Sequence, residues 1–430
     1  MAAALGVLAS CGSVKSGEDA IAASRDSKVV VAYVTSWSDV MPDPQCMTHI
    51  NYAFGHVNES FNGVKIDNEE RLKQIVDLKK QKPDLKVLLS IGGWGSGRFS
   101  EMAANDEYRR AFAADCDRVV KEFALDGIDI DWEYPTSSMA NISSSPDDTE
   151  NFTLLMQDIR AAIGNEKELT LATVASARYI DFKAILPSVD FVNIMAYDMA
   201  SAPKHHSALY PSGHSGDITS DGAVTAHLKA GVPPSKLVMG MPFYGRGGDG
   251  YPSFQDYNKV GNTDTQYTEK WDEVAQVPYL ADKNDTLVFG FENPRSLAIK
   301  CQYILDKDLL GGMYWDYSGD NEQGDLRRTV AENLLGKPHK AKVLVLTERG
   351  GQHGGFTDAG LKWLAAEGAK GNFSITEINN ARNITEAYLS QFSLVIQLDF
   401  PPYTWPKEAE DAFVKYIEEG RGGWIGFHHA

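Results

Sequence analysis

The chain has 430 residues, of which 43% are hydrophobic, and it carries a formal net charge of −18. Its length accommodates two or three domains with a sizeable core, and its composition is not that of a disordered chain. Because binding to nucleic-acid phosphates needs clustered Lys and Arg, the acidic surplus argues against a nucleic-acid partner and favours an uncharged or cationic substrate.

The first 27 residues read as a signal and linker rather than as part of a folded domain. They open with MAAALGVLASCGS, a short apolar run that ends at Cys11 and precedes a polar stretch. The run resembles the end of a bacterial lipoprotein signal, in which the cysteine becomes lipidated. It is too short to span a bilayer, and the alternative is an unstructured extension. We expect an extracytoplasmic protein, either secreted or attached to the membrane of the cell envelope through Cys11.

From residue 28 onward, short runs rich in β-branched residues alternate with helical stretches, which is typical of parallel βαβ units. One such helix is expected at 106–124 and another at about 294–307. Eight strands are predicted, at 28–37, 47–57, 85–95, 125–135, 169–176, 189–199, 236–246 and 310–320. A barrel of eight strands typically needs about 250 residues plus insertions, so the pattern favours an α/β fold of the (β/α)8 TIM-barrel type.

The fourth predicted strand carries acidic residues where a buried strand would be apolar. In LDGIDIDWEYP, residues 125–135, alternation places Asp129, Asp131 and Glu133 on one face and apolar side chains on the other. Inside a barrel these carboxylates repel one another, which raises the pKa of at least one. Glu133 comes last, at the carboxyl end where barrel enzymes keep their catalytic groups. We therefore predict that Glu133 is a general acid.

Clustered carboxylates are also potential metal ligands. The histidines, however, lie mostly in the pairs at 205–206 and 428–429, away from this strand, so no metal site and no cofactor are predicted. Cys46, Cys116 and Cys301 have no CxxC spacing and are expected to be buried packing residues.

The pattern Asp126-x-x-Asp129-x-Asp131-x-Glu133 resembles the catalytic signature of glycoside hydrolase family 18, the chitinases and endo-β-N-acetylglucosaminidases. Four further segments agree in the expected order: SIGGW at 90–94, MAYD at 195–198, GMPFYGR at 240–246 and GGMYW at 311–315. The resemblance covers about residues 28–335 and implies a TIM barrel over that range.

In family 18 the 2-acetamido group of the substrate attacks the anomeric carbon, so no protein nucleophile is needed. The resemblance implies that Glu133 acts as general acid and then as base, and that Asp131 orients the acetamide. It also implies that Asp129 shares a proton with Asp131, that Tyr197 hydrogen-bonds the acetamide carbonyl, and that Asp126 is structural. The expected sugar-binding side chains are Trp315, Asp198, Trp94, Trp37, Met195, Tyr244, Arg246 and Phe54.

Some of these positions have a second interpretation. Phe54 is equally consistent with packing inside the barrel, whereas Trp37 and Trp94 fall at strand ends and favour the site. Ser90, Gly92 and Gly93 are expected to be small residues that let the strand pass under the carboxylates.

The sequence also departs from the family pattern. Residues 199–203, MASAP, replace the usual continuation after the MAYD segment, which puts binding of the leaving sugar in doubt. Residues 247–309 are too few for the full insertion domain of many processive chitinases, so we expect a shallower groove.

The resemblance implies a monomeric, retaining hydrolase of β-1,4 bonds between N-acetylglucosamine units of chitin or chito-oligosaccharides. One alternative is an endo-β-N-acetylglucosaminidase that acts on N-glycan cores. A non-catalytic glycan-binding lectin is a second alternative, against which the presence of Glu133, Asp131 and Tyr197 argues.

After residue 335 the pattern changes. GKPHK at 336–340 reads as a linker, and strands are predicted at 342–348, 373–378, 392–399 and 422–429, with helices at 358–368 and 407–420. KVLVLTERGGQHGGF and GGWIGFHHA resemble the ThuA-like domains, relatives of class I glutamine amidotransferases. The resemblance covers residues 341–430 and implies the first part of a doubly wound α/β domain. Because amidotransferases need a nucleophilic cysteine and none follows Cys301, that chemistry is not expected.

Overall fold

The structure is a computed structural model that describes residues 28–248, 251–260, 267–336, 341–347, 349, 354–368, 373–398 and 405–427. The predicted lipoprotein segment, with Cys11, lies outside these residues. The chain divides into two compact units, Met1–Gly336 and Lys337–Ala430.

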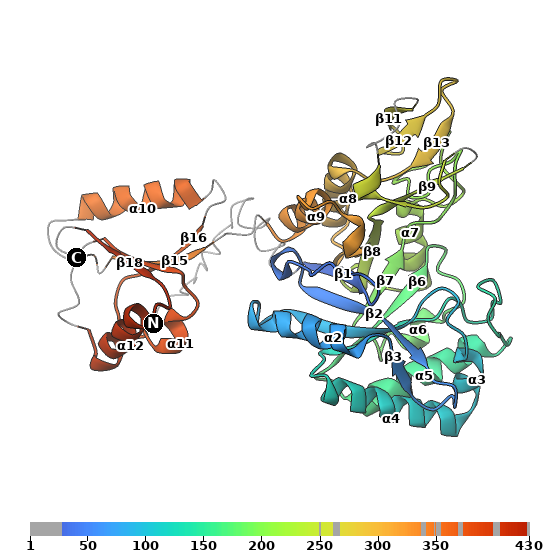
Figure 1. Cartoon of the computed structure of the whole chain (residues 1–430), viewed down its shortest axis with the longest axis horizontal. Helices are drawn as coiled ribbons and strands as arrows, with labels where there is room; N and C mark the ends of the chain where they lie inside the picture. Colours follow the sequence, from blue (N-terminus) through green and yellow to red (C-terminus); the bar gives the residue numbers. More distant parts are fainter. Residues whose placement is uncertain are drawn as a thin grey trace, which may run out of the picture. The chain divides into compact units, whose positions relative to one another are not determined.

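Eight parallel strands close into a barrel in the first unit (Figure 1). Their order around the barrel is β1 (Val29–Thr35), β14 (Gly311–Trp315), β8 (Leu237–Pro242), β7 (Phe191–Met195), β6 (Glu168–Val174), β5 (Gly127–Asp131), β4 (Lys86–Gly92) and β2 (His49–Val57). Strand β2 pairs back onto β1 and closes the ring, and β3 (Val64–Ile66) adds to β2 in the antiparallel sense. The predicted (β/α)8 TIM barrel is confirmed.

Helices surround the barrel: α2 (Glu69–Val76), α3 (Phe99–Ala104), α4 (Asp106–Glu122), α5 (Asp148–Ile163), α6 (Phe182–Ile185), α7 (Ser220–Ala230), α8 (Pro294–Asp306) and α9 (Asp325–Leu334). Helix α4 shows why they form. The Asn105 side chain caps its first amides, and Phe112, Cys116, Val119 and Val120 make one buried face. Among the described residues, no helix is long and apolar enough to cross a membrane.

The barrel wall separates two apolar layers. Outward-facing side chains of the strands pack under the helices in the main core, which includes Ile128, Ile130 and Trp132 of the acidic stretch. Inward-facing side chains such as Tyr33 and Met313 form a smaller cluster inside the barrel. The alternation predicted for residues 125–135 therefore holds for residues 128–132, whereas the strand itself is shorter than predicted and covers Gly127–Asp131. Cys46, Cys116 and Cys301 are free and buried, as expected.

A five-stranded antiparallel sheet is inserted between β8 and α8. Its strands are β9 (Tyr244–Gly247), β10 (Gln255–Asp256), β11 (Thr268–Asp272), β12 (Val277–Ala281) and β13 (Leu287–Gly290), in the order β10-β9-β13-β12-β11. The prediction that the seventh barrel strand runs to residue 246 is wrong. Strand β8 ends at Pro242, and Tyr244 and Arg246 lie on β9, where Arg246 pairs with Gly290 of the inserted sheet.

The second unit is a three-layer α/β domain. Its parallel strands follow the order β16 (Ser374–Ile378), β15 (Lys342–Leu346), β17 (Leu394–Gln397) and β18 (Gly423–Gly426). Helix α10 (Gly354–Gly368) covers one face, and α11 (Glu386–Leu389) and α12 (Lys407–Glu418) cover the other (Figure 1). Two apolar clusters, one on each face of the sheet, hold these layers together. The predicted α/β architecture is confirmed, with α10 beginning four residues earlier than predicted.

Candidate active site

Strand β5 carries the predicted row of carboxylates at the mouth of the barrel. Asp129 is fully buried, Asp131 is the last residue of the strand and 4% exposed, and Glu133 follows two residues later with a half-buried side chain. Because side chains of a strand alternate, these residues project on the inner side of the barrel wall. Three carboxylates therefore lead from the barrel interior to its carboxyl end.

Asp129 is surrounded by hydrogen-bond donors from four other strands. Its Oδ2 accepts from the Tyr33 hydroxyl at 2.9 Å and from the Ser90 hydroxyl at 2.8 Å. Its Oδ1 accepts from the Thr170 hydroxyl at 2.6 Å and from the Asn193 amide at 3.3 Å. Burial raises the pKa of Asp129, and these hydrogen bonds oppose that rise. No motif in the sequence indicates that Tyr33, Thr170 and Asn193 belong to the site.

Asp131 and Glu133 lie in a different environment. The buried Oδ1 of Asp131 has no hydrogen-bond partner within the described part of the chain. Burial, followed by the charges of Glu133 and Asp129, raises the pKa of Asp131 well above its usual range. Burial also raises the pKa of Glu133 to about 7, with a further contribution from the negative charge of Asp198 and an opposing one from a hydrogen bond with Tyr134. Glu133 can therefore hold a proton close to neutral pH.

Asp198 is held as a carboxylate beside this row. Arg246 donates to its two oxygens at 2.7 and 2.6 Å, and His206 Nδ1 lies 3.4 Å from Oδ1. Burial works toward a higher pKa for Asp198, but the hydrogen bonds from Arg246 and His206 outweigh it and hold that pKa well below the usual range. The inserted sheet thus contributes a cation to the barrel mouth through β9.

Tyr197 and Met195 come from the end of β7. Burial, with the nearby charges of Asp131 and Glu133, raises the pKa of Tyr197 well above that of a free tyrosine, so its hydroxyl stays protonated. The Tyr197 ring meets the Tyr244 ring edge-on, with centroids 6.1 Å apart. Met195 is half-buried and packs against the cluster inside the barrel. Tyr197 is therefore available as a neutral donor next to the carboxylates.

An aromatic group forms one side of the mouth. Trp315 stacks on Phe54 with ring centroids 5.6 Å apart and an interplanar angle of 21°. Trp37 lies 6.4 Å from Trp315 and is 64% exposed. Both interpretations of Phe54 apply, because it belongs to the cluster inside the barrel and also supports Trp315.

A second aromatic group lies near the acidic stretch. Trp94 is 61% exposed and meets Tyr134 edge-on, with centroids 6.5 Å apart. Tyr134 in turn stacks on Tyr179 at 5.5 Å. Tyr179 was not identified from the sequence, because it lies in the loop after β6 and its neighbours there carry no motif.

Gly92 and Gly93 show why small residues are required under the carboxylates. A Cβ on Gly92 would lie 2.0 Å from the backbone oxygen of Asp131, and one on Gly93 would lie 2.6 Å from the Phe54 ring. Both glycines have positive φ values, which glycine adopts at no steric cost. Ser90, expected only to be small, also donates to Asp129.

Asp126 lies at the other end of β5 and has a structural environment. Its Oδ2 accepts from Lys79 Nζ at 2.6 Å and from the Val87 amide at 2.9 Å. This pairing fixes the start of β5 next to β4 and agrees with the expectation from the sequence. Within the ranges that the structure describes, no group of three or more His, Cys, Asp or Glu side chains could hold a metal ion.

Comparisons with known proteins agree with this geometry. Residues 29–320 match the model of "Glycosyl hydrolases family 18", and residues 342–430 match the ThuA model, described as "Trehalose utilisation". Chitinase A1 of Niallia circulans is 30% identical over 71% of this chain, which spans 58% of that protein. Chitotriosidase-1 of Mus musculus is 31% identical over 69% of this chain and 74% of its own length.

Among solved structures, a family 18 N-acetylglucosaminidase from Paenibacillus barengoltzii superposes with a TM-score of 0.66 and 33% identity. The match covers 71% of this chain and 100% of that one.

Proposed function

Because the chain belongs to glycosyl hydrolase family 18 and is a glycoside hydrolase, we propose that it cleaves β-1,4 bonds between N-acetylglucosamine units of chitin or chito-oligosaccharides. The observation that carries this proposal is the position of the half-buried Glu133 at the barrel mouth, two residues beyond Asp131. Burial brings the pKa of Glu133 to about 7, where a carboxylic acid can give up and recover a proton.

In the first step, Glu133 gives its proton to the glycosidic oxygen. The carbonyl oxygen of the 2-acetamido group attacks the anomeric carbon, the bond to the leaving sugar breaks, and an oxazolinium-like intermediate forms. In the second step, the Glu133 carboxylate takes a proton from water, the oxygen of that water attacks the anomeric carbon, and the acetamide is restored. The two inversions give overall retention of configuration.

Asp131 orients the acetamide in this proposal. Its buried Oδ1, which has no partner in the described structure, provides an acceptor for the acetamide N–H. The negative charge of Asp131 also stabilises the positive charge of the intermediate. Tyr197 donates its hydroxyl to the acetamide oxygen. We further propose that Asp129 shares a proton with Asp131, which lets Asp131 alternate between its neutral and charged forms.

The aromatic side chains hold the sugar rings. Trp315 lies under the sugar ring whose anomeric carbon is attacked, because an indole face stacks on the apolar face of a pyranose. Trp37 and Trp94, both strongly exposed, take neighbouring rings on the two sides. Phe54 supports Trp315 from below. The remaining proposed contacts are Met195, Tyr244, Asp198 and Arg246.

A product assay tests the proposal. The wild-type chain and Glu133→Gln are given N-acetylated chitin oligosaccharides in one reaction and a high-mannose N-glycopeptide in another. Release of short N-acetylglucosamine oligomers that is lost in the variant is the expected result. Release of an intact glycan points instead to an endo-β-N-acetylglucosaminidase, and turnover of neither compound by the wild type contradicts both.

A single-sugar product is the second candidate, and one observation favours it. The solved family 18 structure reported above is named an N-acetylglucosaminidase and is covered completely by this chain. The same assay separates the two modes of action, because an N-acetylglucosaminidase releases single sugars from the first turnover onward, whereas an endo-acting chitinase releases oligomers first.

We also propose that the enzyme acts outside the cytoplasm as a monomer, with membrane attachment through a lipidated Cys11. The sequence around Cys11 is the support for this attachment. Expression in a bacterial host with a labelled fatty acid tests it: the label is expected in the full-length chain and absent from Cys11→Ser.

A further inference from the structure

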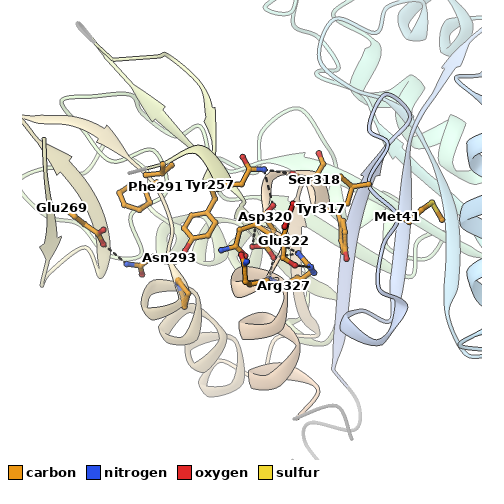
Figure 2. A pocket seen from close by; sticks show the side chains of 16 residues that line it. Met41, Tyr257, Glu269, Phe291, Asn293, Tyr317, Ser318, Asp320, Glu322 and Arg327 are labelled. Atoms are coloured by element: carbon orange, nitrogen blue, oxygen red, sulfur yellow. Dashed lines mark hydrogen bonds and ion pairs between the residues drawn. The ribbon is translucent and has the colours of Figure 1, made fainter. Parts of the chain in front are cut away.

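A cavity of about 970 Å³ lies in the first unit (Figure 2). One wall comes from Glu269 on β11 of the inserted sheet and from Tyr257 in the turn after β10, and another from the segment between β14 and α9. The loop after β1 contributes Met41, four residues beyond Trp37. Tyr317 lies two residues beyond Trp315. A volume of this size is typical of pockets that take small molecules.

One aromatic ring of the cavity lining, that of Tyr257, is exposed enough to contact a sugar ring. Its lining includes Tyr257, Phe291 and Tyr317. Figure 2 shows Tyr257 standing between Phe291 and the Asp320 region, where its ring borders the cavity. Tyr257 is half-buried, whereas Phe291 and Tyr317 are buried. Aromatic rings next to polar side chains are the usual combination for binding pyranoses, which have both apolar faces and hydroxyl edges.

The cavity lining has more acidic side chains than basic ones. Arg327 is paired with Asp320 at 3.0 Å, and Asp320 also accepts from three backbone amides, so these two groups largely neutralise each other. Glu269 and Glu322 add two exposed carboxylates, of which Glu269 accepts from the Asn293 amide at 3.3 Å. The pKa of Tyr257 is raised to about 12, first by burial and then by neighbouring carboxylates that include Asp320 and Glu269. The cavity is therefore negative.

We propose that this cavity is a second glycan-binding site, selective for glucosamine units whose 2-ammonium groups pair with Glu269 and Glu322. N-acetylglucosamine is neutral and gains nothing from two carboxylates, whereas a deacetylated unit keeps the pyranose faces and adds a cation. The choice of an amino-sugar polymer as ligand rests on the proposed function.

The test uses a glucosamine pentamer with no acetyl groups, because it lacks the acetamide that the proposed mechanism needs and is not consumed. Its binding to the intact chain is measured by calorimetry for the wild type and for Glu269→Gln/Glu322→Gln. The matched control is Glu107→Gln/Glu332→Gln, which removes two exposed carboxylates outside the cavity. Hydrolysis of the fully N-acetylated pentamer is measured in parallel.

The cavity variant is expected to bind the glucosamine pentamer about two- to thirtyfold more weakly, and the control variant to bind it like the wild type. Binding by the wild type is also expected to weaken as salt is raised. Absence of binding by the wild type, or unchanged binding by the cavity variant, overturns the proposal; in the second case the acidic catalytic centre is the binding site. Failure of the proposed function is seen separately, as absence of hydrolysis of the N-acetylated pentamer.

Discussion

Asp129 and Glu133 lie on the same side of one short stretch, and burial raises the pKa of both, but their surroundings differ. Asp129 accepts hydrogen bonds from four side chains on four other strands. Glu133 is less buried, yet burial and the charge of Asp198 raise its pKa to about 7. In the barrel interior, hydrogen-bond donors therefore stabilise the charged form of Asp129. At the mouth, Glu133 has a pKa at which it can gain or lose a proton near neutral pH.

This difference follows from the position of each residue relative to the end of β5, since Asp129 lies within the strand and Glu133 two residues beyond it. At Asp129 the neighbouring strands are close on both sides, so their inward side chains reach its oxygens. Beyond Asp131 the strand has ended and the ladder no longer supplies neighbours at fixed distances. Burial without matching donors disfavours the charged form, and the pKa rises. In the proposed function, the same barrel thus holds a hydrogen-bonded acid in its interior and a proton-exchanging acid four residues further along the chain.

Replacement of Glu133 has the largest expected effect on activity. Glu133→Gln removes the proton donor and is expected to lower kcat by about 10²–10⁴-fold, the usual contribution of general acid–base catalysis. Hydrolysis of chitin oligosaccharides measures this, and circular dichroism checks that the fold is kept. A variant with kcat close to that of the wild type contradicts the role of Glu133.

The same variant should also change the pH dependence of stability. The folded-state pKa of Glu133 is about 7, above its unfolded value, so the folded protein binds this proton more tightly than the unfolded chain does. The free energy of unfolding therefore falls as the pH rises from the unfolded-state pKa to the folded-state pKa. Glu133→Gln removes that loss, so it is expected to melt at a higher temperature than the wild type at pH 8 and to differ less at pH 5. Equal melting temperatures at both pH values would argue against a raised pKa.

Replacement of Asp129 is expected to destabilise the barrel, in addition to removing the group that is proposed to share a proton with Asp131. Asp129→Leu leaves buried donors at Tyr33, Ser90, Thr170 and Asn193 without their acceptor, at a cost of roughly 2–5 kcal/mol. Asp129→Asn is the matched variant, because its amide keeps one acceptor oxygen and the hydroxyls can turn to accept from its NH₂ group. Urea unfolding of the barrel should therefore rank wild type above Asn and Asn above Leu. Similar stabilities for all three contradict the importance of the hydrogen-bond network.

The carboxylate next to Glu133 should have a smaller, pH-dependent effect. Asp198 raises the pKa of Glu133 through its negative charge, so Asp198→Asn is expected to lower that pKa and to move the alkaline limb of kcat/KM to lower pH, by about one unit or less. The control is Asp285→Asn, which removes an exposed carboxylate paired with Lys270 in the inserted sheet. A shift to higher pH, or an equal shift in the control, contradicts this coupling.

The sequence could predict the carboxylate row, because strand alternation is local and three acids on one face of a buried strand are rare. It could also predict the barrel, since eight β-branched runs have the lengths and spacing of βαβ units. The donors around Asp129 could not be predicted. Tyr33, Thr170 and Asn193 each look like ordinary strand residues, and only closure of the barrel brings them together.

The inserted sheet was not predicted either, because its pairing also depends on residues that are far apart in the sequence. Its strands are short, between two and five residues, and pair in a non-sequential order that no local pattern reveals. The segment GMPFYGR was therefore assigned to one strand, although the chain leaves the barrel after Pro242. As a result, the pairing of Arg246 with Asp198 across 48 positions could be seen only in the structure.

The smallest expected effect comes from a single donor to Asp129. Tyr33→Phe removes one of four hydrogen bonds to Asp129 and is expected to cost about 1 kcal/mol of stability. Tyr52→Phe is the matched control, because Tyr52 is also buried but donates to the backbone oxygens of Asp67 and Asn68, away from the carboxylates.

Both variants should lose similar stability in urea, and only Tyr33→Phe should alter the pH profile of kcat/KM. With one donor fewer, the charged form of Asp129 is less stabilised, so its pKa rises and Asp129 carries less negative charge at a given pH. The pKa of Asp131, which the Asp129 charge raises, then falls. An unchanged pH profile in Tyr33→Phe would mean that Asp129 contributes only to the stability of the fold and that its charge is not coupled to Asp131 and Glu133.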